Sequence, residues 1–75
     1  MTERVKRVLS QVFGVPIEAI ADDASPDSLE QWDSVTHLNL VLALEEEFSI
    51  SLTDEQIVEL LSCEIIVATV KESLA

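Results

Sequence analysis

Apolar residues recur at helical spacing along the first segment of the chain. The repeat i, i+3, i+4, i+7, i+8, which is typical of one helix face, is occupied by Val5, Val8, Leu9, Val12 and Phe13. Thr2 is a suitable N-cap, Gly14 is a typical residue just past a helix end, and Pro16 prevents an easy continuation. The pattern therefore predicts a helix over residues 2–13.

A long connection follows, over residues 15–33. Its apolar residues Val15, Ile17 and Ile20 are expected to anchor it to the core. The segment Ser28-Leu29-Glu30-Gln31 is expected to cap one short helical turn. A connection of this length in a small domain is unusual and is often functional.

Local sequence also indicates two further helices. Residues 34–48 are rich in Leu and Glu and contain no Gly or Pro, which predicts a helix that begins after Asp33. The segment Thr-Asp-Glu-Gln at residues 53–56 matches the capping box. It is expected to open a short helix that ends at about Leu61.

The final segment, residues 62–74, combines two patterns. The β-branched residues 65–67 locally favour a strand. One helical face is nevertheless formed by Cys63, Val67, Val70 and Leu74. We predict a helix here, because a lone strand would have no partner to pair with.

Together these elements predict an all-α fold, a four-helix up-down bundle with three main helices and one short helix. With 75 residues, the chain has the length of a single domain, residues 1–75. The expected core consists of Val5, Val8, Leu9, Val12, Phe13, Ile17, Leu40, Leu44, Phe48, Ile50, Ile57, Leu60, Val67 and Val70.

The predicted helix over residues 34–48 has apolar residues on two sides. The expected core stripe contains His37, Leu40, Val41, Leu44 and Phe48. The roughly opposite stripe contains Val35, Leu38 and Leu42, with Glu45 and Glu46 beside it. In one interpretation the helix is central and both stripes are buried. In the other, the second stripe is exposed and binds a partner protein whose groove has a basic rim.

The chain is strongly acidic, with fifteen Asp and Glu residues against four Lys and Arg residues and a net charge of −11. Between Val8 and Val70 there are thirteen acidic residues and no Lys or Arg. Nucleic-acid binding is therefore excluded, because phosphate contacts need basic side chains. The charge favours partners with basic surfaces, or it serves only solubility.

Several other classes of protein lack their usual signals. With Cys63 as the only cysteine, no intrachain disulfide can form, and this residue is expected to be a buried apolar residue. Apolar runs are too short for a membrane span, and charged residues near the start argue against a signal peptide. A cytoplasmic location is the simplest interpretation. An enzyme is not expected, since no Cys/His pair, Gly-rich phosphate loop or metal-ligand cluster is evident.

Ser34 lies where the second helix is predicted to begin. Free backbone N–H groups and the helix dipole at that position would favour an attached or nearby phosphate. Asp33 before it is a candidate N-cap, and an ordinary helix-start serine is the alternative role for Ser34.

The segment from Leu29 to Val35, together with the Leu-Glu-Glu-Glu-Phe ending at residues 44–48, resembles acyl carrier proteins. In that family an Asp-Ser-Leu motif opens the second helix. The resemblance covers nearly the whole chain. It implies that Ser34 receives 4′-phosphopantetheine from coenzyme A and that Asp33 is the adjacent motif acid. The face presented to partner enzymes would consist of Val35, Leu38, Leu42, Glu45 and Glu46.

The same resemblance implies the partners: a phosphopantetheinyl transferase, and acyl ligases or synthases and acyltransferases with basic docking surfaces. We expect a monomer. The sequence departs from the family pattern in that Val35 replaces the usual Leu and Asn39 stands where many relatives have an acid. His37 is also unusual, and we interpret it as a boundary residue of the helix. Trp32 is expected to pin the loop.

Three alternatives remain open. A peptidyl or aminoacyl carrier would usually have a Gly-Gly pair before the serine and fewer acidic residues. An EF-hand calcium site would need a central Gly and a final Glu in register, which the acidic segment 23–33 lacks. An unmodified acidic helical adaptor would keep its activity after Ser34→Ala, whereas a carrier would lose it.

Overall fold

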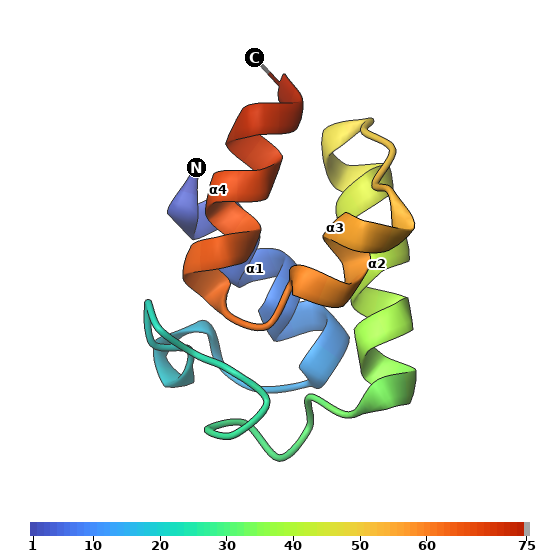
Figure 1. Ribbon diagram of the computed structural model, residues 1–75. Coiled ribbons are helices and arrows are strands. Elements are labelled where there is room, and N and C mark those ends of the chain that lie inside the picture. The colour runs from blue at the N-terminus through green and yellow to red at the C-terminus, as the bar shows by residue number, and fades with distance from the viewer. Residues whose placement is uncertain (75) are drawn as a thin grey trace.

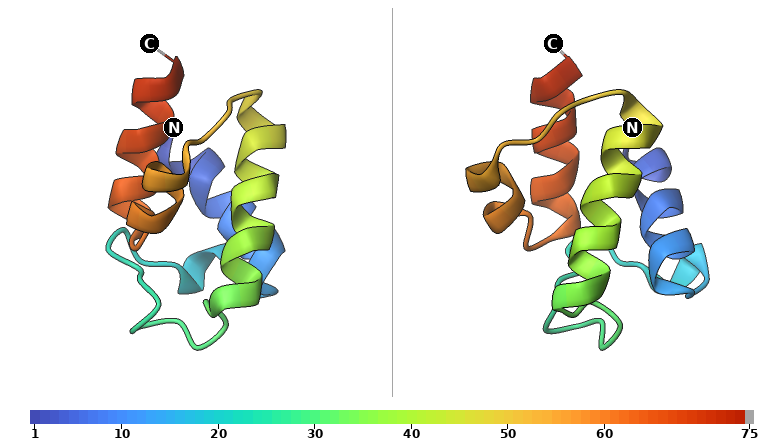
Figure 2. Two further views of the ribbon diagram at one scale, coloured as in Figure 1. Left: turned by 45° about the vertical axis from the view of Figure 1, so that its right-hand side comes forward. Right: turned by 90° about the vertical axis from the view of Figure 1, so that its right-hand side faces the viewer.

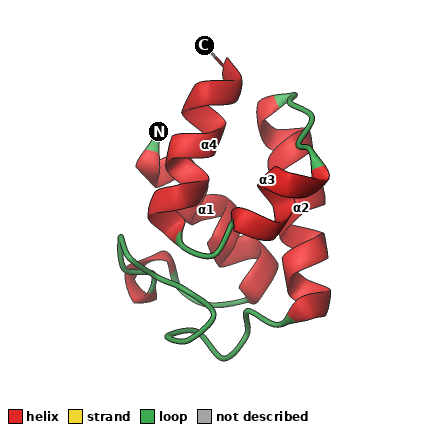
Figure 3. Ribbon diagram, viewed as in Figure 1, coloured by secondary structure: helices red, strands yellow, loops and turns green. Residues whose placement is uncertain are grey.

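The computed structural model describes residues 1–74 and contains four α-helices and one short 3₁₀ helix within them (Figure 1). In chain order these are α1 (Thr2–Phe13), η1 (Ile17–Ala19), α2 (Ser34–Phe48), α3 (Asp54–Glu59) and α4 (Cys63–Leu74). No strand occurs in the described residues, so the last segment is helical as predicted (Figure 3). The all-α fold with three main helices and one short helix is confirmed.

The helices alternate in direction. In Figure 1, α1 descends from the N-terminus, α2 rises from the long loop, the segment containing α3 returns, and α4 rises to the C-terminus. Figure 2 shows from two further sides that α1, α2 and α4 stand beside one another, with α3 across the opening between α2 and α4. The long loop closes the lower end of the bundle, where α2 begins.

The ends of α1 follow from its flanking residues. Gly14 ends the helix in the left-handed conformation, with φ 69°, and its N–H donates to the carbonyl of Ser10. Thr2, however, is the first helical residue and not the N-cap. Met1 occupies the N-cap position and makes no side-chain cap hydrogen bond, so the predicted cap is wrong by one residue.

The long loop between α1 and α2 differs from its predicted form in two places. It contains the short helix η1, and Ser28 does not open a helical turn. The reason is that the Ser28 hydroxyl bonds backwards, where it accepts from the N–H of Ser25 and donates to the Ser25 carbonyl. The loop is held by its own buried residues, Ile20, Ala24 and Trp32.

Most of the expected core is buried. The buried members are Val5, Val8, Leu9, Phe13, Leu40, Leu44, Phe48, Leu60 and Val70. The others are only partly buried, namely Val12, Ile17, Ile50, Ile57 and Val67. The core also includes Ile20, Trp32, Val41 and Cys63, which were expected as a loop anchor, a residue that pins the loop, a member of the core stripe and a buried apolar residue, respectively. Ala24 and Ile66 are buried as well and were not predicted. On α4 the buried face contains Ile66, whereas Leu74 is exposed, so the predicted face was rotated.

Within residues 1–74, none of the helices has both the length and the apolar character needed to cross a bilayer.

Candidate functional site

The start of α2 is fixed by a reciprocal pair of hydrogen bonds. Asp33 is the N-cap, and its carboxylate accepts from the backbone N–H of Thr36 at 2.9 Å. The Thr36 hydroxyl in turn accepts from the backbone N–H of Asp33 at 2.8 Å. This capping box satisfies two backbone donors that a helix start would otherwise leave free. Asp33 is therefore placed as the sequence predicted, as the N-cap.

The same bonds lower the pKa of the Asp33 carboxyl. The backbone N–H of Thr36 is the main cause, followed by the Thr36 side chain, and both bind the ionised form best. The carboxylate is thus held in its charged state at the end of the helix where the dipole favours negative charge.

Ser34 is the first residue of α2 and is exposed. Since Asp33 and Thr36 complete the cap between them, the Ser34 hydroxyl is not needed for capping and faces solvent beside a pocket. It stands at the positive end of the helix dipole, where an attached phosphate is stabilised. The exposure and position of Ser34 therefore fit a phosphodiester-linked group.

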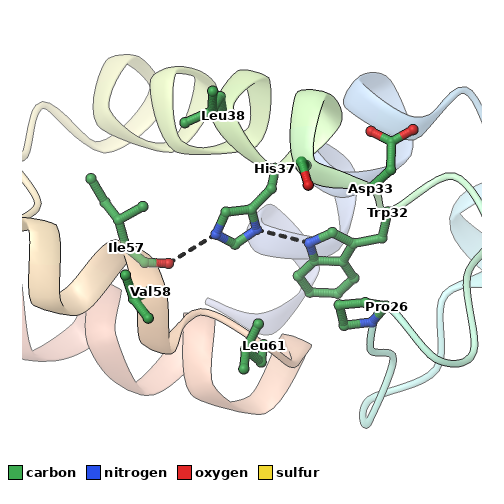
Figure 4. A pocket seen from close by; sticks show the side chains of 9 residues that line it. Pro26, Trp32, Asp33, His37, Leu38, Ile57, Val58 and Leu61 are labelled. Atoms are coloured by element: carbon green, nitrogen blue, oxygen red, sulfur yellow. Dashed lines mark hydrogen bonds between the residues drawn. The ribbon is translucent and has the colours of Figure 1, made fainter.

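A pocket of about 510 Å³ lies between Ser34, α3 and the long loop. Its lining is mostly apolar and consists of Pro26, Trp32, Asp33, Ser34, His37, Leu38, Ile57, Val58 and Leu61. Figure 4 shows that these side chains come from the loop, from the first turns of α2 and from the region of α3. The residues at and beyond α3, namely Ile57, Val58 and Leu61, were not predicted as part of a site.

His37 connects the loop and α3 across this pocket. The indole N–H of Trp32 donates to Nδ1 of His37 at 2.9 Å, and Nε2 of His37 lies 2.8 Å from the carbonyl oxygen of Ile57 (Figure 4). An indole N–H can only donate and a carbonyl can only accept. The imidazole must therefore be neutral, with its proton on Nε2. His37 is partly buried, as expected for a boundary residue, but its two partners were not evident from the sequence.

Trp32 pins the loop, as expected. It is 4% exposed, and its ring lies against that of Phe13 with 5.3 Å between ring centroids. The indole thus packs on α1 with one face and holds His37 through its N–H. The loop end that carries Asp33 is anchored to the core by this one side chain.

The second apolar stripe of α2 is exposed. Val35, Leu38 and Leu42 are between 61% and 69% exposed, so the interpretation in which α2 is buried all round is wrong. The apolar surface continues onto the α3 side, where Val58 is 70% exposed and Leu61 is also exposed. We call these five residues the apolar face.

The acidic residues near the apolar face differ in their exposure and in the bonds that their carboxylates make. Glu46 is exposed, whereas Glu45 is partly buried and its carboxylate accepts from the N–H of Leu52 at 2.8 Å. Glu45 therefore orders the loop after α2 as well as contributing charge. Glu47 pairs with Arg4 at 3.0 Å, and the Arg4 guanidinium lies over the ring of Phe48.

Known proteins are similar to this chain in sequence and in fold. The family model described as "Phosphopantetheine attachment site" matches residues 3–70. An acyl carrier protein from Buchnera aphidicola subsp. Schizaphis graminum is 35% identical over 54 residues, which cover 71% of this chain and 67% of that protein. The solution structure of a holo acyl carrier protein from Geobacter metallireducens superposes with a TM-score of 0.86 at 22% identity. That match covers 97% of this chain and 84% of the other, and it shows a shared fold.

Proposed function

The chain belongs to the acyl carrier proteins of the phosphopantetheine-attachment family, and we propose on that premise that Ser34 is the residue that bears 4′-phosphopantetheine. Members of this family are carriers and not catalysts. The observation that carries the proposal is an exposed serine hydroxyl at the first position of α2, beside a mostly apolar pocket.

The residues around Ser34 suit this task. When bound, 4′-phosphopantetheine supplies a terminal thiol that carries an acyl group as a thioester. The phosphate would lie at the N-terminus of α2, where the helix dipole stabilises negative charge. Asp33 and Thr36 hold the backbone on both sides of Ser34, so the point of attachment keeps a fixed position.

The apolar face is the surface on which partner enzymes would dock. Val35, Leu38 and Leu42 begin one residue after Ser34 and continue along α2, so a bound partner would lie beside the attachment point. The carboxylate of Glu46 would face a basic rim on that partner, and so would the carboxylate of Glu45, which also binds the N–H of Leu52. A phosphopantetheinyl transferase and acyl-group synthases or ligases and acyltransferases are the partners of this chemistry.

The family match favours an acyl carrier over a peptidyl carrier and over an unmodified adaptor. The test is the intact mass of the folded chain after incubation with coenzyme A and a broad-specificity phosphopantetheinyl transferase. We expect the wild type to gain one phosphopantetheine and Ser34→Ala to gain none.

Ser28→Ala is the matched control, because Ser28 is another exposed serine of the same region. It should be modified like the wild type. A folded wild type that gains no mass, or a Ser34→Ala chain that still gains it, would overturn the proposal.

A further inference from the structure

His37 stands at the junction of three parts of the molecule. Its imidazole is carried by α2, receives a hydrogen bond from Trp32 of the loop and donates one to the Ile57 carbonyl of α3. Ile57 lies 20 residues further along the chain, so the bond is a tertiary contact. We call this Trp32–His37–Ile57 arrangement the bridge.

The bridge lies between the pocket and the sealed core. His37 shares one face of α2 with Leu40 and Leu44, one and two turns further along. Both leucines are 0% exposed, whereas His37 still contributes to the pocket wall. A chain that starts at Ser34 and follows this face of α2 inward therefore meets the imidazole before it meets the leucines.

The bridge closes that route with polar atoms that are already paired. Both ring nitrogens of His37 and the indole N–H of Trp32 have partners, and displacing the ring would leave partly buried donors and acceptors unsatisfied. An alkyl chain offers no replacement for these bonds. Moving His37 aside is therefore unfavourable for an apolar cargo.

The pocket on the outer side of the bridge offers a different environment. Leu38, Val58 and Leu61 line it and are all largely exposed, so the pocket is a shallow apolar surface. A short acyl group can contact this surface without entering the core. The longer part of a long alkyl chain would stay in water.

From this geometry we propose that His37 is a specificity-determining residue, which keeps long acyl chains out of the interior and makes the chain a carrier of short acyl groups. The inference rests on the proposed attachment at Ser34, and it assigns the cargo class of that same site. Within it, short means a group that reaches only the residues on the outer side of the bridge, Leu38, Val58 and Leu61.

The test loads Ser34 from acetyl-, hexanoyl- and dodecanoyl-coenzyme A and follows each thioester by melting temperature and by NMR. In the wild type we expect similar melting temperatures for all three. The terminal methyl of the dodecanoyl chain should show no nuclear Overhauser contacts to the methyl groups of Leu40 or Leu44. The hexanoyl methyl should contact Leu38, Val58 or Leu61.

His37→Ala removes the bridge and should admit the long chain. The dodecanoyl form of this variant should then melt roughly 5 °C or more above its acetyl form, with contacts to Leu40 and Leu44. His37→Gln can accept from Trp32 and donate to Ile57, so it should behave like the wild type. Val58→Ala alters the outer pocket alone and should still exclude the long chain.

Two results would overturn the inference. The first is contact between the dodecanoyl methyl and Leu40 or Leu44 in the wild type. This measurement does not depend on whether a variant folds. The second is found in the unmodified chain. If the indole N–H of Trp32 exchanges with solvent as fast in the wild type as in His37→Ala, or if the His37 ring carries its proton on Nδ1, the bridge is absent. Failure of the attachment itself is distinguished at once, because the mass of the chain then does not change.

Discussion

The side chains of Asp33 and Thr36 exchange hydrogen bonds with each other's backbone N–H groups, at 2.9 Å and 2.8 Å, and so enclose Ser34 between them. The arrangement fixes the backbone at the start of α2 without using the serine hydroxyl. It also makes the order of this helix start dependent on the ionisation of one carboxyl group.

Acid should therefore weaken the start of α2. The pKa of Asp33 in the folded chain is lowered from its ordinary value of 3.8, first by the backbone N–H of Thr36. A lowered pKa adds stability above the ordinary value, and this stability is lost as the pH falls through the folded-state pKa. Asp33→Asn keeps an acceptor but does not titrate there. Urea unfolding at pH 5 and pH 3 should show a smaller loss of stability for Asp33→Asn than for the wild type, and equal losses would contradict the prediction.

Leu38→Glu should weaken the docking of partner enzymes without unfolding the chain. Leu38 is exposed, so the free energy of unfolding should change by no more than about 0.5 kcal/mol. The loss of one apolar contact on the apolar face should lower kcat/KM for the transferase by about tenfold. Leu44→Ala is the matched control on the buried side of α2 and should cost about 2–5 kcal/mol of stability. Unfolding of Leu38→Glu would show that this stripe belongs to the core.

Cys63 should react slowly while the chain is folded. Cys63 is 0% exposed, and burial raises the pKa of its thiol above the ordinary 9.0. The charge of Lys6 opposes this shift, whereas the carboxylates of Asp22 and Glu64 add to it. Only the thiolate is nucleophilic, so labelling with iodoacetamide at pH 8 should be on the order of a hundredfold slower in buffer than in urea. Because the folded-state pKa is raised, the associated stability is present below pH 9 and is lost as the pH rises through that pKa. Fast labelling in buffer would mean that the start of α4 opens readily.

Two backbone positions should respond in opposite directions. Gly14 has φ 69°, and no other atom lies within 4 Å of a Cβ added there. The cost of Gly14→Ala is therefore conformational and should be about 1 kcal/mol. Ser49 ends α2 with φ 53°, so Ser49→Gly should relieve strain and raise the stability by a few tenths to about 1 kcal/mol. Urea denaturation measures both, and a destabilised Ser49→Gly would mean that the serine side chain contributes more than its strain costs.

Salt should stabilise the fold. With a net charge of −11 and bases confined to the two ends of the sequence, the folded chain repels itself. Screening of this repulsion should raise the melting temperature between low and moderate salt, and divalent cations should act at lower concentration. A melting temperature that does not move would show that the charges are spaced too widely to matter.

The helices were predictable because their signals are local. Each of these signals depends on a few neighbouring residues. They are the capping boxes that open α2 and α3, and Gly14, which ends α1. The partners of the buried loop residues were not predictable in this way. Trp32 is buried because Phe13 and His37 lie against it, and that contact depends on the tertiary fold.

The face of α4 shows a second limit. Apolar and β-branched residues occupy so many positions of this helix that several faces satisfy the helical spacing. Only packing against the rest of the core selects Ile66 and leaves Leu74 exposed. At the site, the Asp33–Ser34 motif and the exposed stripe of α2 could be recognised from sequence. The hydrogen bond from His37 to Ile57 joins residues 20 positions apart and leaves no local signal.

The capping box also sets the distance between the start of the arm and the exposed stripe of α2. If Ser34 bears the arm, as proposed, the cap formed by Asp33 and Thr36 fixes the point where the arm begins. An α-helix rises about 1.5 Å per residue, so Leu42 at the far end of the α2 stripe lies only about 12 Å along the helix axis from Ser34. An enzyme that docks on this stripe would then find the start of the arm at the same distance in every complex. The depth of a partner's active site would be matched to the length of the arm, and the carrier would not need to change shape from one partner to the next.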